Sequence, residues 1–113
     1  MIDWTRITNL REEVGEEDFA EVVEIFIEEV SEMVQSMREA PKLETLGADL
    51  HALKGSALNL GFTTFSELCQ AGETAAANGQ AASVPIEPIL NNYEKSKEVL
   101  LAGLSEQTAL RSA

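Results

Sequence analysis

The stretch that decides the fold is Leu43–Leu60, which reads LETLGADLHALKGSALNL. Its apolar side chains recur at alternating steps of three and four residues, at Leu43, Leu46, Leu50, Leu53, Ala57 and Leu60. Side chains at these steps share one face of an α-helix, and such a stripe is typical of a helix that packs in a bundle. The pattern therefore predicts a helix over about 42–60, between Pro41 and Gly61.

The segments on either side show the same helical periodicity. The sequence predicts a first helix from a cap at Asp3 to about Val14, a second over 16–39, a fourth from a capping box at 64–67 to about Asn78, and a fifth from about Pro85. The connections are short, and no strand pattern competes with the helices. We therefore predict an all-α fold, an antiparallel up-down four-helix bundle with a short additional N-terminal helix.

Length and composition agree with one domain. The chain has 113 residues, 44% of them hydrophobic, and its 20 acidic and 8 basic residues give a net charge of −12. A bundle domain over 1–104 with a flexible tail at 105–113 is predicted. Because so acidic a surface repels nucleic-acid phosphates and anionic membranes, we expect neither as a partner, and we expect a monomer.

No sequence feature indicates a leader, a membrane anchor or a metal site. The first residues lack a basic start followed by an apolar stretch, and nowhere do about 18 apolar residues run together. The single cysteine, Cys69, has no partner for an intramolecular disulfide, and no Cys/His cluster offers ligands for zinc. We therefore expect a cytoplasmic protein with no cofactor and no metal.

The single histidine, His51, is predicted to point into solvent. At about 100° per residue it lies roughly 130° from the centre of the apolar stripe. Its neighbours one turn away are Gly47, Ala48, Lys54 and Gly55, three of which have almost no side chain. The two glycines together lower helix propensity by about 2 kcal/mol, so a specific reason for them is expected. That reason is either close helix packing or access of a large partner to the imidazole.

Lys54 is the only lysine or arginine between Lys42 and Lys95. It follows His51 by one helical turn, so its ammonium can reach a group attached to the ring. A neutral imidazole is nucleophilic near physiological pH, and a phosphoryl group on it would carry about two negative charges that the ammonium can offset. The alternative is an ordinary surface histidine beside a solvated lysine.

The residues that follow His51 resemble a known family, the histidine-containing phosphotransfer (HPt) domains of multistep two-component signalling. The matching stretch is His51-x-Leu53-Lys54-Gly55-Ser56-Ala57-x-Asn59-Leu60-Gly61, and the likeness in helix order covers the whole chain. The resemblance implies that His51 is phosphorylated on Nε2, that Lys54 stabilises the phosphoryl group and that Gly55 provides clearance.

The resemblance also involves the predicted fourth helix. Family members often place Gln or Glu 22 positions after the histidine, and Glu73 stands there, which implies that it orients the ring through Nδ1. Gln70, one turn earlier, is a second polar candidate near the site. Gly72 departs from the pattern, because a larger apolar residue is expected in this seam.

The implied function is relay of a phosphoryl group through His51 between a hybrid sensor histidine kinase and the aspartate of a response-regulator receiver domain. The chain contains no glycine-rich phosphate loop and no kinase signature, so we expect a phosphoryl carrier and not an enzyme. The docking face is predicted to surround His51 and to include Gly47, Ala48, Leu58 and parts of the predicted first and second helices. We expect a free-standing shuttle, with a domain excised from a larger kinase as the alternative.

Two other functions fit parts of the sequence. The segment 46–50 is similar to the start of the attachment site in acyl carrier proteins, but that site needs a serine where Leu50 stands. A helical interaction module without phosphoryl chemistry would be expected to lose the histidine or the lysine, and both are present. The ten carboxylates from Glu12 to Glu32, with no cation among them, form either a solvated face or an electrostatic docking surface.

Overall fold

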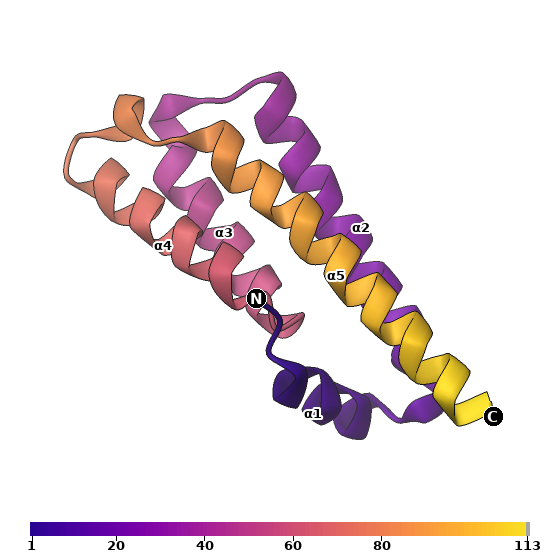
Figure 1. Cartoon of the computed structure of the whole chain (residues 1–113). Coiled ribbons are helices and arrows are strands. Elements are labelled where there is room, and N and C mark those ends of the chain that lie inside the picture. Colours follow the sequence, from indigo (N-terminus) through magenta and orange to yellow (C-terminus); the bar gives the residue numbers. More distant parts are fainter. Residues whose placement is uncertain (113) are drawn as a thin grey trace.

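The computed structural model describes the backbone of residues 1–112 and the side chains of residues 1–106. Its helices are α1 (Trp4–Val14), α2 (Glu16–Glu39), α3 (Leu46–Asn59), α4 (Thr63–Ala77) and α5 (Ile86–Ser112), with short 3-10 turns at Leu43–Thr45 and Ala81–Ser83. In Figure 1, α2 to α5 run alternately up and down, and α1 lies near the end where α2 begins. The predicted all-α bundle with an additional N-terminal helix is confirmed.

The core lies between the four long helices and consists of the stripes that periodicity predicted. From Leu46 onward, every stripe residue of the central stretch is at most 1% exposed. The other helices contribute Phe19, Val23, Val30, Val34, Met37, Phe65, Cys69, Ile89, Leu90, Tyr93 and Leu100. The hydroxyl of Tyr93 donates to the carbonyl of Ile27 at 3.2 Å and shares a 2.7 Å hydrogen bond with Ser31. The largest buried side chain therefore has partners for its polar end.

The third helix begins later than the sequence predicted. Residues Leu43–Thr45 form a 3-10 turn, and the α-helix starts at Leu46. A 3-10 helix has 3.0 residues per turn, whereas an α-helix has 3.6. The 3-10 turn therefore rotates Leu43 away from the buried stripe. Leu43 is consequently 51% exposed.

The fourth helix begins at Thr63 without a side-chain cap, so the predicted capping box at 64–67 is wrong. The N–H and the hydroxyl of Thr63 both donate to the carbonyl of Met1, at 3.1 and 2.9 Å. Next to it, Ile2 and Phe62 form an isolated antiparallel bridge. A contact with a distant part of the chain therefore takes the place of the local cap.

Asp3 connects this N-terminal contact to α1. Its N–H donates to the carbonyl of Gly61 at 2.7 Å, while its side chain accepts from the N–H groups of Thr5 and Arg6, which confirms the predicted cap. Gly61 has φ +69°, and a Cβ there would lie 2.7 Å from the carbonyl oxygen of Asp3. The turn between α3 and α4 therefore requires glycine for both its conformation and its close neighbour.

The last helix is longer than the predicted apolar pattern. α5 continues to Ser112, so the segment 105–113 begins inside a helix, and Ala113 lies outside the described residues. A Cβ on Gly103 would overlap the indole of Trp4, so α1 packs closely on α5 at this point. The limits predicted for the bundle and its tail stay predictions.

The ten carboxylates between Glu12 and Glu32 are all exposed. They lie on α1 and α2, outside the core. Exposure agrees with both interpretations, a solvated face and a docking surface. None of the helices, over the range that is described, has the length and apolar character needed to cross a bilayer.

Gly72 faces the core from α4, and Leu50 of α3 occupies the space in front of it. A Cβ at Gly72 would lie 2.6 Å from Cδ1 of Leu50 and 3.2 Å from Cγ1 of Val84. The seam thus combines a large side chain on α3 with none on α4. Leu50 fills the space that a larger apolar residue was expected to occupy at position 72. This pairing lets the two helices approach closely.

We expect alanine to have opposite effects at two helical glycines. Gly72→Ala should lower the free energy of unfolding by about 1–3 kcal/mol, because Leu50 or Val84 must move. Gly55→Ala should raise it by about 0.5–1 kcal/mol through helix propensity, since no atom lies within 4 Å of the added Cβ. Urea unfolding of both variants is the measurement. A Gly72→Ala protein as stable as the parent would mean that the seam is loosely packed.

Candidate functional site

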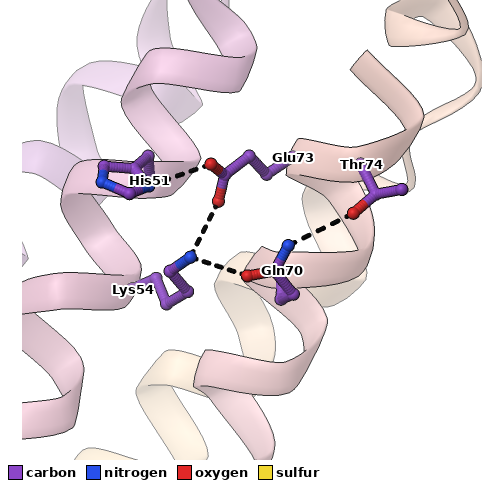
Figure 2. Close-up of polar contacts among 5 residues, drawn as sticks. All are labelled: His51, Lys54, Gln70, Glu73 and Thr74. Carbon is purple, nitrogen blue, oxygen red and sulfur yellow. Dashed lines mark hydrogen bonds and ion pairs between the residues drawn. The ribbon is translucent and has the colours of Figure 1, made fainter. Parts of the chain in front are cut away.

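The candidate site lies on the outer side of the α3–α4 pair, as Figure 2 shows. His51 and Lys54 belong to α3, one helical turn apart, and Glu73 belongs to α4. The side chain of His51 is 67% exposed, whereas those of Lys54 and Glu73 are 21% and 25% exposed. The imidazole therefore stands in solvent, as the wheel geometry predicted, while the charged pair beside it is partly shielded.

Glu73 connects the other two side chains through its two oxygens. Its Oε1 lies 2.9 Å from Nδ1 of His51, and its Oε2 accepts a hydrogen bond from Nζ of Lys54 at 3.1 Å. The structure thus brings together three residues that the sequence analysis named separately. The 22-residue spacing between His51 and Glu73 corresponds to this contact across the helix pair.

The carboxyl of Glu73 has a lowered pKa. The hydrogen bond from Lys54 is the main cause, the hydrogen bond with His51 acts in the same direction, and partial burial opposes both. Glu73 is therefore ionised at neutral pH and can only accept hydrogen bonds. Its contact requires a proton on Nδ1 of His51, which leaves Nε2 of a neutral ring with a free lone pair. In Figure 2 the second ring nitrogen points away from Glu73.

Gln70 and Thr74 extend the network along α4. Nζ of Lys54 donates to Oε1 of Gln70 at 2.6 Å, and Nε2 of Gln70 donates to Oγ1 of Thr74 at 3.2 Å. Gln70, predicted as a further candidate, thus contacts Lys54 and not the histidine. Thr74 was not among the residues predicted from the sequence. Its spacing of four residues from Gln70 was the available signal, because residues at this spacing are neighbours on a helix.

The face of α3 around the imidazole is exposed and almost without side chains. Ala48, His51, Gly55 and Leu58 follow one another at steps of three, four and three, and each of them is exposed. Apart from its chain neighbours and the backbone of its own helix, no heavy atom lies within 4 Å of the position that a Cβ on Gly55 would take. Leu58 is 51% exposed and is the large apolar side chain of this face. The histidine is therefore open to a large molecule along the helix.

Gly47 differs from Gly55 in what it contacts. A Cβ at Gly47 would lie 3.4 Å from the Cβ of Ala76 on α4. A Cβ at Gly47 would therefore make an ordinary van der Waals contact with α4, whereas nothing in the fold fills the space at Gly55. Gly47 and Ala76 also line a shallow hollow beside His51 and Glu73. Of the two explanations offered by the sequence, close packing does not require glycine at position 47, and the open space at Gly55 agrees with access of a partner.

Cys69 is not a competing nucleophile. It is buried beneath the network on α4, and burial, reinforced by Glu73, raises its pKa to about 12. A thiol with this pKa stays protonated, and the thiol is a far weaker nucleophile than the thiolate. Within the described side chains no group of acidic, His and Cys residues has the arrangement of a metal site.

Comparison with known proteins agrees with this geometry. The family model described as the Hpt domain matches residues 21–107, which include all but the first residues of α2 and all of α3 and α4. This chain belongs to the Hpt domain family. Neither the curated proteins nor the solved structures gave a match.

Membership in the Hpt family implies a function in phosphoryl transfer. Hpt domains are phosphoryl carriers of phosphorelays and not kinases, and their partners are proteins of two-component systems. The matched range contains the whole candidate site, from His51 to Thr74. The α1 helix, which packs on the end of the bundle, lies outside the match.

We expect the carboxyl of Glu73 to titrate below the ordinary value of 4.5, and Lys54→Met to raise its pKa. The lowered pKa means that folding favours the ionised carboxylate of Glu73. The contribution of this carboxylate to stability is therefore complete above pH 4.5, and it is lost as the pH falls through the pKa of Glu73 in the folded protein. The measurement is a ¹³C NMR titration of the Glu73 carboxyl in both proteins. Equal midpoints would contradict the role given to Lys54.

Proposed function

We propose that this Hpt domain carries a phosphoryl group on Nε2 of His51. The group comes from the receiver aspartate of a hybrid sensor kinase and passes to the receiver aspartate of a response regulator. One observation carries the proposal: His51 combines an exposed ring, an Nδ1 held by Glu73 and an unobstructed approach over Gly55. A structural histidine would require none of the three.

The chemistry follows from the protonation of the ring. The lone pair of Nε2 forms a bond to phosphorus while the P–O bond to the donor aspartate breaks, and the carboxylate leaves with the electron pair. The ring keeps its proton on Nδ1 and becomes positively charged. The ionised Glu73, 2.9 Å from Nδ1, stabilises this charge as it develops.

The reverse step uses the same arrangement. A ring protonated on Nδ1 leaves phosphorus as a neutral imidazole, which is a better leaving group than an imidazolate anion. The phosphoryl group can therefore pass to the aspartate of the next receiver. Lys54, one turn from the ring, supplies the positive charge near the transferred group.

The docking face consists of Ala48, His51, Gly55 and Leu58, with the hollow beside Gly47 at its edge. These residues support the proposal because all four are exposed. Ala48 and Gly55 are small and leave the reactive ring accessible, and Leu58 offers one apolar contact. A receiver domain must bring its aspartyl phosphate to within bonding distance of Nε2. A bare helix surface permits that approach.

We expect a receiver domain phosphorylated on its aspartate to label this protein in an acid-labile, alkali-stable linkage, and His51→Gln to abolish the label. Glutamine is polar and of similar size but has no nucleophilic nitrogen. The measurement is transfer of ³²P together with the acid and alkali stability of the product. Label in the His51→Gln protein would exclude His51 as the acceptor, and a receiver that binds without transfer would favour the interaction module.

We expect Gly55→Leu to reduce the rate of transfer by about tenfold or more, because a side chain would stand where the partner approaches. Ala102→Leu, an equivalent change at an exposed position of α5, serves as the control for added apolar surface. Stopped-flow or quench-flow transfer, with circular dichroism to confirm folding, is the measurement. Transfer at the parental rate in Gly55→Leu would refute the clearance role.

A further inference from the structure

The Lys54 ammonium is already bound on the α4 side of the site. Two of its three N–H donors are engaged, by Oε1 of Gln70 at 2.6 Å and by Oε2 of Glu73 at 3.1 Å. In Figure 2 the ammonium points toward these two acceptors, whereas the second nitrogen of His51 points away from Glu73. The charge that should stabilise a phosphoryl group is therefore held elsewhere before that group arrives.

The chemistry of the side chains dictates the orientation of the Gln70 amide. An ammonium has no acceptor, so only Oε1 can face Lys54, and the NH₂ group then faces Thr74. The Thr74 hydroxyl accepts from that NH₂ group at 3.2 Å. A rotated amide would place its NH₂ group against the ammonium and lose the bond to Lys54, whereas the Thr74 hydroxyl could donate to the amide oxygen instead. Lys54 therefore selects the orientation of the amide, and the bond to Thr74 holds the Gln70 side chain beside it.

We propose that Gln70, held in place by Thr74, is a positioning residue that holds the Lys54 ammonium on the α4 side and opposes its movement to a phosphoryl group on His51. The inference rests on the proposed function, in which His51 is the phosphoryl carrier. Lys54 has a flexible four-carbon stem and follows His51 by one turn, so its ammonium can reach either position. It leaves Gln70 when it moves to the phosphoryl oxygens.

A contact that is present in one state and absent in the other shifts the equilibrium between them. Gln70 binds Lys54 in the unphosphorylated protein, so it disfavours the phosphorylated one. This restraint makes the carrier easier to discharge. Glu73 also binds Lys54, but its effect differs from that of Gln70. It also stabilises the positively charged ring of the phosphorylated state.

The experiment measures phosphoryl exchange between His51 and phosphoramidate, without a protein partner. The Nε2 lone pair bonds to phosphorus as the P–N bond of phosphoramidate breaks, and ammonia leaves with the electron pair. ³¹P NMR at fixed phosphoramidate and ammonium concentrations gives the ratio of phosphorylated to free protein. We expect Gln70→Ala to raise this ratio about threefold to tenfold, as loss of one hydrogen bond of typical net strength at an exposed position implies.

Three further variants separate positioning from general stability. Thr74→Val should raise the ratio to a smaller extent, and Thr74→Ser, which keeps the hydroxyl, should restore it. In a Lys54→Met background Gln70→Ala should have no effect, because it acts through the ammonium. Gln35→Ala is the matched control, since Gln35 is also exposed and also bonded to the residue four positions later, Glu39.

An unchanged or lowered ratio in Gln70→Ala overturns the inference, as does an effect that persists without the lysine. Failure of the proposed function has a different signature. In that case a phosphorylated receiver domain does not label His51, although phosphoramidate still exchanges with the exposed ring.

Discussion

The site depends on one carboxylate that accepts hydrogen bonds from two side chains on the neighbouring helix. Glu73 uses Oε1 for the imidazole and Oε2 for the Lys54 ammonium, so the ring orientation and the position of the positive charge are coupled. The lysine also maintains the ionisation of the carboxylate, as the lowered pKa of Glu73 indicates. If either bond is removed, the other changes with it. The three side chains therefore act as a unit, and substitution effects within it should not be additive.

This contact requires α3 and α4 to lie close together, and glycine makes that approach possible. Gly72 leaves room for Leu50 in the core, and Gly47 lies against Ala76 nearer the surface. At both levels a side chain on one helix meets a glycine on the other. Gly55 of α3 is different, because the space in front of it is open. Glycine thus permits close packing at Gly72 and leaves an open surface at Gly55.

The sequence predicts those parts of the structure that follow from local periodicity. The stripe from Leu46 to Leu60 and the exposure of His51 both follow from 100° per residue, and the cap at Asp3 from its side chain. The contact of Glu73 was implied by family resemblance and has no local signal. Contacts across the fold were not predictable: Thr63 bonds to Met1 in place of a cap, and Thr74 supports Gln70. The sequence likewise does not distinguish Gly47 from Gly55, because their surroundings depend on the position of α4.

A carrier must accept a phosphoryl group readily and also release it, and this constrains how strongly its site can hold the group. In the proposed relay Glu73 would favour both steps, because a ring that keeps its Nδ1 proton is a nucleophile in one direction and a neutral leaving group in the other. A free ammonium beside the phosphoryl oxygens would favour only acceptance and would slow release. In a chain of net charge −12, Lys54 is the positive side chain that contacts the site network, and Glu73 and Gln70 already engage it. In the proposed relay the network would thus supply a positive charge to the phosphoryl group while limiting how tightly that charge can hold it.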